Sequence, residues 1–481
     1  MLCPKTGMAQ GILRKFRETF FMGKIDAVKR ILVLQLVTVE FLLDVAGYAF
    51  FWFFKYKGLV EVRFWQKGDA LVIVIYAAIL MAFFLAYGAG KIGYLRSFEI
   101  FLSKAFSVLA TNLISYAQLS LMTGKLINPK FILVLTAAQL VFSLVWSFAG
   151  NAVYRSVFAP RDLLLVCGDR PVDEIVEKFN SRKDRFVIAK IMNISEGEEA
   201  IEAEILNRYQ GVVIWDIPMK SRNNLLKYCY SKSIRVYMMP KISDVIVQGA
   251  DVLHFFDTPV ILTREYPLTF EQRFVKRTID LVCALLLIIL TSPIMLITAF
   301  IIKVSDGGPV FYKQKRVTIG GKVFKIVKFR SMRVDAEKDG KARLASKGDP
   351  RITPFGRFIR KVRIDELPQL FNIVAGDMTF IGPRPERPEI IEEYIKSMPE
   401  FEFRTKVKAG LAGYAQVYGK YNTTPYDKLK LDLLYIENYT TWLDIRLMLL
   451  TLKVLFLPDA TEGVEQGQLT ALKKESEAEN K

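Results

Sequence analysis

Histidine and cysteine are scarce in this 481-residue chain. The single histidine, His254, excludes a metal site built from several histidines, and we expect it to be structural. The four cysteines show neither metal-site spacing nor a disulfide framework, which indicates reducing surroundings for the soluble parts. The N-terminus also lacks the short apolar region and cleavage site of a removable signal peptide.

Negative charge is in short supply as well. Lysine and arginine number 67 against 49 aspartates and glutamates, which gives a net charge of +18 in a chain that is 52% hydrophobic. Such a protein could bind nucleic acid, an anionic membrane face or phosphorylated substrates. The long apolar runs favour the last two, so we expect no nucleic acid partner. The length predicts about three domains.

The first predicted domain, residues 1–155, is a membrane bundle. Four apolar segments are each long enough to cross about 30 Å of hydrocarbon as a helix. They are residues 31–54, 68–90, 103–123 and 131–150. Many cations before the first segment place the N-terminus in the cytoplasm, and four crossings return the chain there. Glu40 and Asp44 interrupt the first segment on one helical face, and we expect both to point into the bundle.

The second predicted domain, residues 156–265, is α/β and Rossmann-like. Short apolar runs alternate with charged helical segments, as in a parallel sheet. The runs are residues 163–166, 186–191, 211–215 and 234–238. A dinucleotide site needs a glycine-rich turn after the first strand, but the turn Cys167–Pro171 has one glycine where three are required. We therefore predict a fold without its usual cofactor; a regulatory role, an assembly surface and a spacer all remain open.

Residues 278–302 are almost all apolar and resemble a fifth membrane helix. Ser292 and Pro293 lie just past the middle, where proline removes a backbone hydrogen bond and disrupts the preceding turn. Cations flank both ends, which suits a helix that enters, breaks and returns to the same face better than one that spans. The pattern alone leaves a re-entrant helix and a kinked spanning helix equally open.

An acid pair, Asp365 and Glu366, follows a run of cations and precedes Pro368, which suits a first helical turn. Such carboxylates can act as nucleophile or metal ligand beside arginines that hold phosphate. An isolated acid pair is more often a solvated helix end. Around it lie a strand-like basic stretch, residues 324–332, and the turn Gly382–Pro385. An amphipathic segment, residues 444–457, is suited to a membrane surface or to covering the core.

Taken together, residues 274–457 resemble the bacterial sugar transferase family, the monotopic polyprenyl-phosphate phosphoglycosyl transferases. The four spans and the α/β domain before them resemble large members that initiate exopolysaccharide, capsule or O-antigen synthesis. The matching residues are Lys276, Arg277, Asp280, Ser292, Pro293, Lys328 to Met332, Arg360, Asp365 to Asn372, Gly376 to Met378, Gly382 to Pro385, Gly410 to Gln416, Leu431, Asp432 and Tyr435.

The resemblance implies transfer of a sugar 1-phosphate from a UDP-sugar to undecaprenyl phosphate, with release of UMP. It implies that Asp365 is the nucleophile that forms a covalent phosphosugar intermediate. Glu366, with Asp365, would hold Mg²⁺. Arg360 would hold phosphate, while Lys328 and Arg384 would bind substrate phosphates or shape the site. Lys420 stands where the family often has arginine, which puts two-point phosphate recognition there in doubt.

By the same resemblance, the third domain is an α/β catalytic module, residues 266–458, with a re-entrant helix at 278–302 and interfacial helices. It faces the cytoplasm at the bacterial inner membrane, in contact with its lipids. A homo-oligomer is left open, and the tail 459–481 is expected to be disordered. The rival functions are a lipid-acting glycosyltransferase, which should carry an Asp-rich metal motif that we do not find, and a non-catalytic membrane scaffold. The sequence does not identify the sugar.

Overall fold

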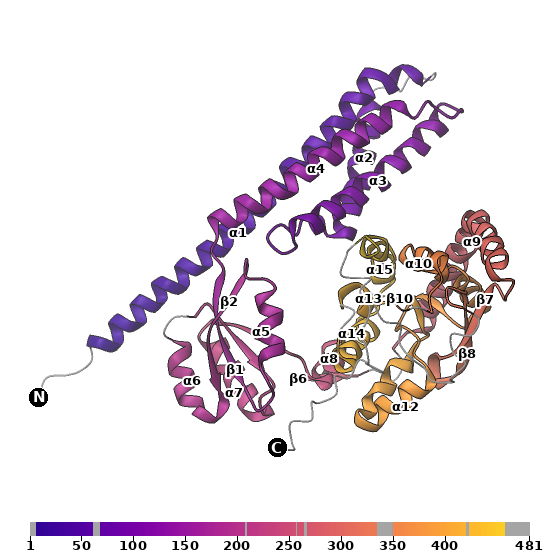
Figure 1. The fold of residues 1–481 in the computed structure, drawn as a ribbon. Helices are drawn as coiled ribbons and strands as arrows, with labels where there is room; N and C mark the ends of the chain where they lie inside the picture. Colours follow the sequence, from indigo (N-terminus) through magenta and orange to yellow (C-terminus); the bar gives the residue numbers. More distant parts are fainter. Residues whose placement is uncertain are drawn as a thin grey trace, which may run out of the picture. The chain divides into compact units, whose positions relative to one another are not determined.

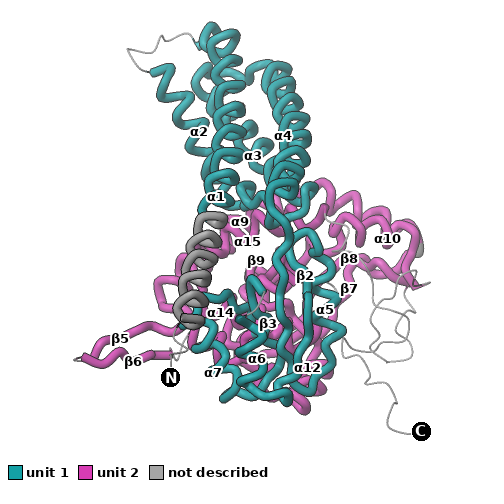
Figure 2. The backbone as a smooth tube through the Cα atoms, turned by 90° about the vertical axis from the view of Figure 1, so that its left-hand side faces the viewer, with its two compact units in different colours: residues 1–239 teal, residues 240–481 magenta. Residues whose placement is uncertain are grey.

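The computed structural model forms two compact units, residues 1–239 and 240–481 (Figure 2). Of residues 6–26 and Asp306 it describes the backbone only. The boundary between the units falls inside the predicted middle domain, whose limits stay a prediction. The described residues are 6–60, 68–206, 209–255, 257–263, 267–333, 349, 351–419 and 423–456.

Four long helices open unit 1 (Figure 1). They are α1 (Thr6–Phe51), α2 (Gly68–Tyr87), α3 (Ser97–Met122) and α4 (Lys130–Val157). A π-helical turn, Trp52–Tyr56, and a 3₁₀ turn, Lys57–Leu59, extend α1. All four helices are long and apolar enough to cross a membrane. The predicted helical region with several apolar helices is therefore confirmed.

Buried polar side chains line the interior of this bundle. Glu40 and Asp44 are both buried, as predicted, and Glu40 Oε2 lies 2.5 Å from Lys104 Nζ of α3. Asn112 Nδ2 donates to Gln139 Oε1 (2.8 Å), and Gln139 Nε2 donates to the backbone oxygen of Asp44 (3.2 Å). Polar groups in an apolar bundle need partners on neighbouring helices, so these contacts specify how α1, α3 and α4 pair.

A four-stranded parallel sheet of order β2-β1-β3-β4 follows. Its strands are β1 (Arg161–Cys167), β2 (Phe186–Asn193), β3 (Gly211–Trp215) and β4 (Arg235–Met238). Helix α5 (Asp173–Asn180) packs on one face, while α6 (Glu198–Ile205) and α7 (Met219–Ser231) pack on the other (Figure 1). The four predicted strands and their α/β alternation are confirmed.

The single glycine of the turn after β1 is explained by packing. A Cβ at Gly168 would overlap the carbonyl oxygen of Asp216, which follows the neighbouring strand β3. Gly168 N also donates to Trp215 O (3.2 Å). The ends of the two strands therefore meet backbone to backbone, at the edge where ligands of open parallel sheets bind.

Unit 2 begins with α8 (Ile242–Gln248) and a hairpin, β5 (Asp251–Phe255) and β6 (Thr258–Leu262), whose residues are mostly exposed. Next come α9 (Phe270–Asp306) and a second antiparallel pair, β7 (Phe311–Val317) and β8 (Val323–Phe329). The remaining elements are α10 (Pro354–Lys361), α11 (Gln369–Ala375), β9 (Thr379–Ile381), α12 (Pro388–Ser397), β10 (Gly410–Ala412), α13 (Tyr414–Tyr418), α14 (Pro425–Glu437) and α15 (Thr441–Val454).

Helix α9 includes Pro293, with helical turns on both sides of it, and the predicted break at Ser292 and Pro293 stays a prediction. Proline has no N–H to bond the carbonyl of Ile289, four residues earlier. Ser292 Oγ donates to that same carbonyl oxygen (2.8 Å) and replaces the missing bond. The prediction took account of the hydrogen bond that Pro293 removes but not of the one that the Ser292 hydroxyl supplies. Whether α9 re-enters the membrane is a separate question from this local geometry.

Both ends of α9 pack against other elements of unit 2. Near its start, Lys276 Nζ donates to Ile381 O (2.9 Å) and to Asp444 Oδ2 (2.6 Å). Near its end, Ile302 belongs to a buried cluster with Phe329. The opposite side of the helix is an exposed apolar stripe, and α9, α10 and α15 lie along one side of the unit (Figures 1 and 2). The stripe includes Leu286, Ile289, Leu290, Leu296, Ile297 and Phe300.

Candidate active site

The acid pair lies on a short 3₁₀ turn, Ile364–Glu366, between α10 and α11. Arg363, at its start, has a left-handed backbone (φ 59°), which is costly for a residue other than glycine and tends to persist at functional sites. Thr353 caps α10 by accepting a hydrogen bond from Gly356 N (2.9 Å). A Cβ at Gly356 would overlap the carbonyl oxygen of Ser331, so α10 passes close to the chain that follows β8.

Glu366 is held by cations from two distant parts of the sequence. Lys328 Nζ on β8 donates to Glu366 Oε1 (2.9 Å), and Arg384 Nη2, in the turn after β9, donates to the same oxygen (3.0 Å). Arg363 Nη1 lies 3.6 Å from it. Burial alone would raise the pKa of Glu366, but Lys328, Arg384 and Arg363 outweigh it and hold the pKa well below its usual range.

Asp365 is in the opposite situation. The residue is 8% exposed, and its Oδ1 is buried and accepts no hydrogen bond from any residue that the structure describes. Burial and the neighbouring Glu366 raise the pKa of Asp365 to about 6, although Lys328, Arg360 and Arg363 act against the rise. Two adjacent carboxylates thus differ in environment, as acid pairs with separate chemical roles do. Glu366 is tied to cations, whereas Asp365 has an oxygen available for a ligand.

Most of the predicted site residues are brought together. Lys328 and Arg384 contact Glu366, and Arg360 on α10 is close enough to influence the pKa of Asp365. Lys420 lies outside the described residues. Ser292 and Pro293 contribute no contact to the acid pair among the interactions described, but Met295, one turn further on α9, clusters with Leu367 directly after it.

The strand that carries Lys328 is held against the helix that follows the acid pair. The Asn372 side chain on α11 accepts from Val327 N (3.0 Å) and donates to Lys325 O (2.9 Å). Asn372 is buried, so it acts as a bridge between β8 and α11. This contact explains why an asparagine occurs in an otherwise apolar helix, and it fixes where Lys328 meets Glu366.

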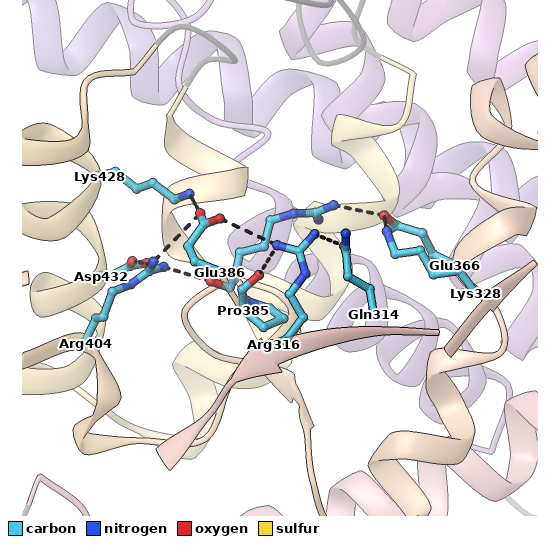
Figure 3. A network of polar contacts seen from close by, with 10 residues as sticks. Gln314, Arg316, Lys328, Glu366, Pro385, Glu386, Arg404, Lys428 and Asp432 are labelled. Atoms are coloured by element: carbon cyan, nitrogen blue, oxygen red, sulfur yellow. Dashed lines mark hydrogen bonds and ion pairs between the residues drawn. The ribbon is translucent and has the colours of Figure 1, made fainter. Parts of the chain in front are cut away.

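A second group of charged residues, which the sequence reasoning did not assign to the site, surrounds the Arg384 turn (Figure 3). Glu386 is paired with Lys428 and lies near Arg316 and Arg404. Arg404 in turn pairs with Asp432 at 2.7 Å. The sequence signals for this group were the position of Glu386 next to the Gly-Pro-Arg-Pro turn and the family match at Asp432. Its other members come from β7, α14 and the 3₁₀ segment Pro399–Lys406.

The described residues contain no group of three or more His, Cys, Asp or Glu that could hold a metal ion alone. The acid pair nevertheless fits Mg²⁺ that is shared with a ligand, because Mg²⁺ is commonly bound by one or two carboxylates together with substrate phosphates. The buried, unpaired Oδ1 of Asp365 is the oxygen that such an ion would use. The residues therefore fit a metal that arrives with a phosphorylated substrate, not a protein-only metal site.

Comparisons with known proteins agree on one family. Residues 271–458 match the model of the bacterial sugar transferase family. The chain is 37% identical over 233 residues to the UDP-N-acetylgalactosamine-undecaprenyl-phosphate N-acetylgalactosaminephosphotransferase of Aeromonas hydrophila, covering 48% of this chain and 54% of that protein. It is similarly related to two proteins called UDP-glucose:undecaprenyl-phosphate glucose-1-phosphate transferase.

The first, from Xanthomonas campestris pv. campestris, is 35% identical over 259 residues, which cover 52% of this chain and 54% of the relative. The second, from Escherichia coli, is 38% identical over 221 residues, which cover 45% of this chain and 47% of the relative. The chain thus spans about half the length of these relatives, and the match to the family model includes the segment that carries the acid pair. The names of the relatives give different sugars.

Proposed function

Because residues 271–458 belong to the bacterial sugar transferase family, we propose that the protein transfers a sugar 1-phosphate from a UDP-sugar to undecaprenyl phosphate. The products are UMP and an undecaprenyl-diphospho-sugar, the first membrane-bound intermediate of a surface polysaccharide. The observation that carries the proposal is the buried, unpaired Oδ1 of Asp365 beside a carboxylate that is neutralised by Lys328 and Arg384.

The charge of the site suits a diphosphate. Four cations lie close enough to the acid pair to affect its pKa values: Lys328, Arg360, Arg363 and Arg384. Against the two carboxylates, they leave two positive charges unmatched, four minus two. The diphosphate of a UDP-sugar carries about two negative charges, and guanidinium groups match phosphate oxygens geometrically. An anionic nucleophile can approach an anionic phosphorus only where such charges are already in place.

In the first half-reaction, an Asp365 carboxylate oxygen attacks the phosphorus attached to the sugar. The bond from that phosphorus to the bridging oxygen breaks, and UMP leaves with the bridging oxygen. In the second half-reaction, a phosphate oxygen of undecaprenyl phosphate attacks the same phosphorus and releases the Asp365 carboxylate. Covalent catalysis of this kind lets two substrates use one pocket in turn.

Glu366 and Asp365 would hold Mg²⁺ when it arrives with the diphosphate. Held there, the metal would supply charge neutralisation at the transferring phosphate. Lys328 and Arg384 keep Glu366 ionised and oriented. In this proposal Arg360, which lies on α10 and lowers the pKa of Asp365, contacts the phosphate oxygens. In this proposal the cationic side chains bind and orient the substrate, while Asp365 alone forms a bond to it.

The packing and the exposed apolar side of α9 support a proposal for how the catalytic unit meets the membrane. Both ends of this helix pack on unit 2, while its outward side is apolar and exposed. A helix that spanned the bilayer would have to carry one end away from the unit. We therefore propose a re-entrant α9 that holds the catalytic unit at the cytoplasmic face of the inner membrane, with the exposed stripe in lipid. There the site meets a soluble nucleotide sugar and a lipid phosphate at the surface.

The proposal is tested by intact-mass spectrometry of the purified protein incubated with a panel of UDP-sugars and Mg²⁺ but no lipid. We expect one donor to add the mass of a sugar phosphate to the wild type and nothing to Asp365→Asn. Adding undecaprenyl phosphate should remove the adduct and release a lipid-linked product. Turnover with lipid but no adduct on Asp365 would overturn the covalent route. A wild type that transfers no sugar phosphate from any donor would overturn the function itself.

A further inference from the structure

Arg404 connects a buried ion pair to the backbone of a site residue. It lies on the 3₁₀ segment Pro399–Lys406 and is 3% exposed, and its partner Asp432 on α14 is 1% exposed. Arg404 Nη2 donates to Asp432 Oδ2 (2.7 Å) and to the backbone oxygen of Arg384 (2.9 Å). Arg384 is the residue whose guanidinium holds Glu366.

The next two residues of the same turn are held in a similar way. Arg316 Nη1 on β7 donates to Pro385 O (3.0 Å), and Val317 N donates to Glu386 O (3.0 Å). All three consecutive carbonyl oxygens, from Arg384 to Glu386, therefore accept a hydrogen bond. The prolines on both sides of Arg384 fix their own φ angles. The backbone from Arg384 to Glu386 is consequently held at each of its three carbonyl oxygens. Figure 3 shows Arg316 beside Pro385, and Arg404 beside Asp432 and Glu386.

Glu386 adds electrostatic support to this arrangement. Its carboxylate pairs with Lys428 and lies 3.8 Å from Arg404 Nη1 and 3.7 Å from Arg316 Nη1. Burial alone would raise the pKa of Glu386, but Lys428, Arg404 and Arg316 outweigh it and lower the pKa to about 2. Glu386 therefore stays charged, and it keeps the two arginines beside the turn whose carbonyl oxygens they hold.

A purely structural role explains this network poorly. Replacing a buried ion pair by apolar residues of similar size is often neutral or stabilising, so stability alone gives little reason to bury Arg404 with Asp432. The Nη2 of Arg404 is already occupied by two acceptors, so this atom is not free for a substrate. What the network does specify is the position of the Arg384 backbone, and through it the contact with Glu366.

We propose that Arg404 and Asp432 are positioning residues, which orient Arg384 onto Glu366 through the Arg384 carbonyl and so prepare the cationic side of the site for the diphosphate. The inference rests on the proposed function, because it assigns these residues a part in the same reaction. It goes beyond that function because it gives the buried ion pair of Arg404 and Asp432, which does not touch the acid pair, an effect on the rate of transfer.

The test is a double-mutant cycle between Arg404→Met and Arg384→Ala, measured by UMP release with lipid acceptor. A positioning error of this kind costs on the order of 10- to 100-fold in rate, so Arg404→Met should lower kcat by about that factor, with a smaller change in KM. In the Arg384→Ala background, Arg404→Met should have almost no further effect. Independent, multiplying effects would overturn the positioning role.

Two further variants separate positioning from folding. Arg404→Lys keeps the charge beside Asp432 but loses the planar fork that reaches two acceptors, so we expect normal thermal stability with a lowered kcat. The matched control is Lys430→Met, which breaks another buried ion pair of α14, that of Lys430 with Asp427 (2.7 Å). Lys430→Met should lower the melting temperature and leave kcat unchanged. The opposite pattern in these two variants would contradict the inference.

A binding measurement keeps the inference testable without turnover. Inorganic pyrophosphate is titrated calorimetrically into the wild type and the same variants. It probes only the cation cradle, that is, the four cations around the acid pair: Lys328, Arg360, Arg363 and Arg384. We expect Arg404→Met to weaken pyrophosphate binding in the wild-type background and to have no further effect in Arg384→Ala. If Arg404→Met leaves pyrophosphate affinity unchanged, the inference fails. A wild type that binds pyrophosphate but transfers no sugar phosphate would instead count against the proposed reaction, and only the reaction.

Discussion

Lys328 donates a 2.9 Å hydrogen bond to Oε1 of Glu366 from a strand that lies 38 residues earlier in the sequence. The contact joins the antiparallel pair β7 and β8 to the 3₁₀ turn of the acid pair. Arg384 reaches the same oxygen from the other direction, so one carboxylate oxygen gathers the cations of two separate segments. Glu366 thereby orders the cation cradle even before a substrate enters.

The first prediction concerns this contact. Lys328→Met removes the positive charge and keeps a side chain of similar size. The pKa of Glu366 should rise, because Lys328 has the largest effect of the cations that lower it. Loss of one preorganised charge in such a site costs roughly 100-fold in rate. Rapid-quench measurement of Asp365 adduct formation should show that loss. Lys328→Arg, which keeps the charge, should retain more activity, and equal rates in both variants would argue against an electrostatic role.

The second prediction concerns stability. Asn372→Ala leaves the Val327 N–H and the Lys325 carbonyl without their side-chain partner, and each unsatisfied buried group costs about 1–3 kcal/mol. We expect a total destabilisation of about 2–6 kcal/mol and a fall in melting temperature of the purified protein. Asn438→Ala is the matched control. Asn438, the residue that follows α14, is exposed and its Nδ2 donates to Leu434 O one turn earlier, so its loss should change stability little. Equal effects would contradict a bridging role for Asn372.

Part of this site was predictable because its signals are local or because the resemblance carried them. Asp365 and Glu366 are adjacent in the sequence, and the four apolar runs that became α1 to α4 are continuous patterns. The meeting of Lys328 and Arg384 at Glu366 has no local signal, and only the resemblance to a family placed them together. The contact itself depends on how β8 and the turn after β9 both reach the acid pair.

The rest could not be read from the sequence for physical reasons. Arg404 and Asp432 are 28 residues apart, and nothing in either segment shows that they pair inside the unit. The left-handed backbone of Arg363 runs against the preference of its residue type. The hydrogen bond from Ser292 to the Ile289 carbonyl, which Pro293 cannot make, likewise has no signal in the apolar pattern of residues 278–302.

The third prediction uses pH. The pKa of Glu386 is about 2 in the folded protein, against an ordinary value of 4.5, so its ionisation favours folding above pH 4.5, and this contribution is lost as the pH falls towards 2. The shift corresponds to about 3 kcal/mol at neutral pH. Thermal unfolding of Glu386→Gln should therefore show lower stability than the wild type at pH 7 and a smaller decline between pH 5 and pH 3. Parallel declines would mean that Glu386 does not supply this dependence.

The last prediction concerns the course of α9. Single cysteines introduced at Thr269, just before the helix, and at Val310, just after it, should react with a membrane-impermeant maleimide only after the cells are opened, because both ends pack on the same unit. Gly58→Cys, in the loop that the predicted topology places outside, is the control and should react in intact cells. Labelling of Val310→Cys in intact cells would mean that α9 crosses the bilayer. The catalytic unit would then be divided by the membrane, and the proposed re-entrant placement, which rests on the packing of Ile302 against Phe329, would be overturned.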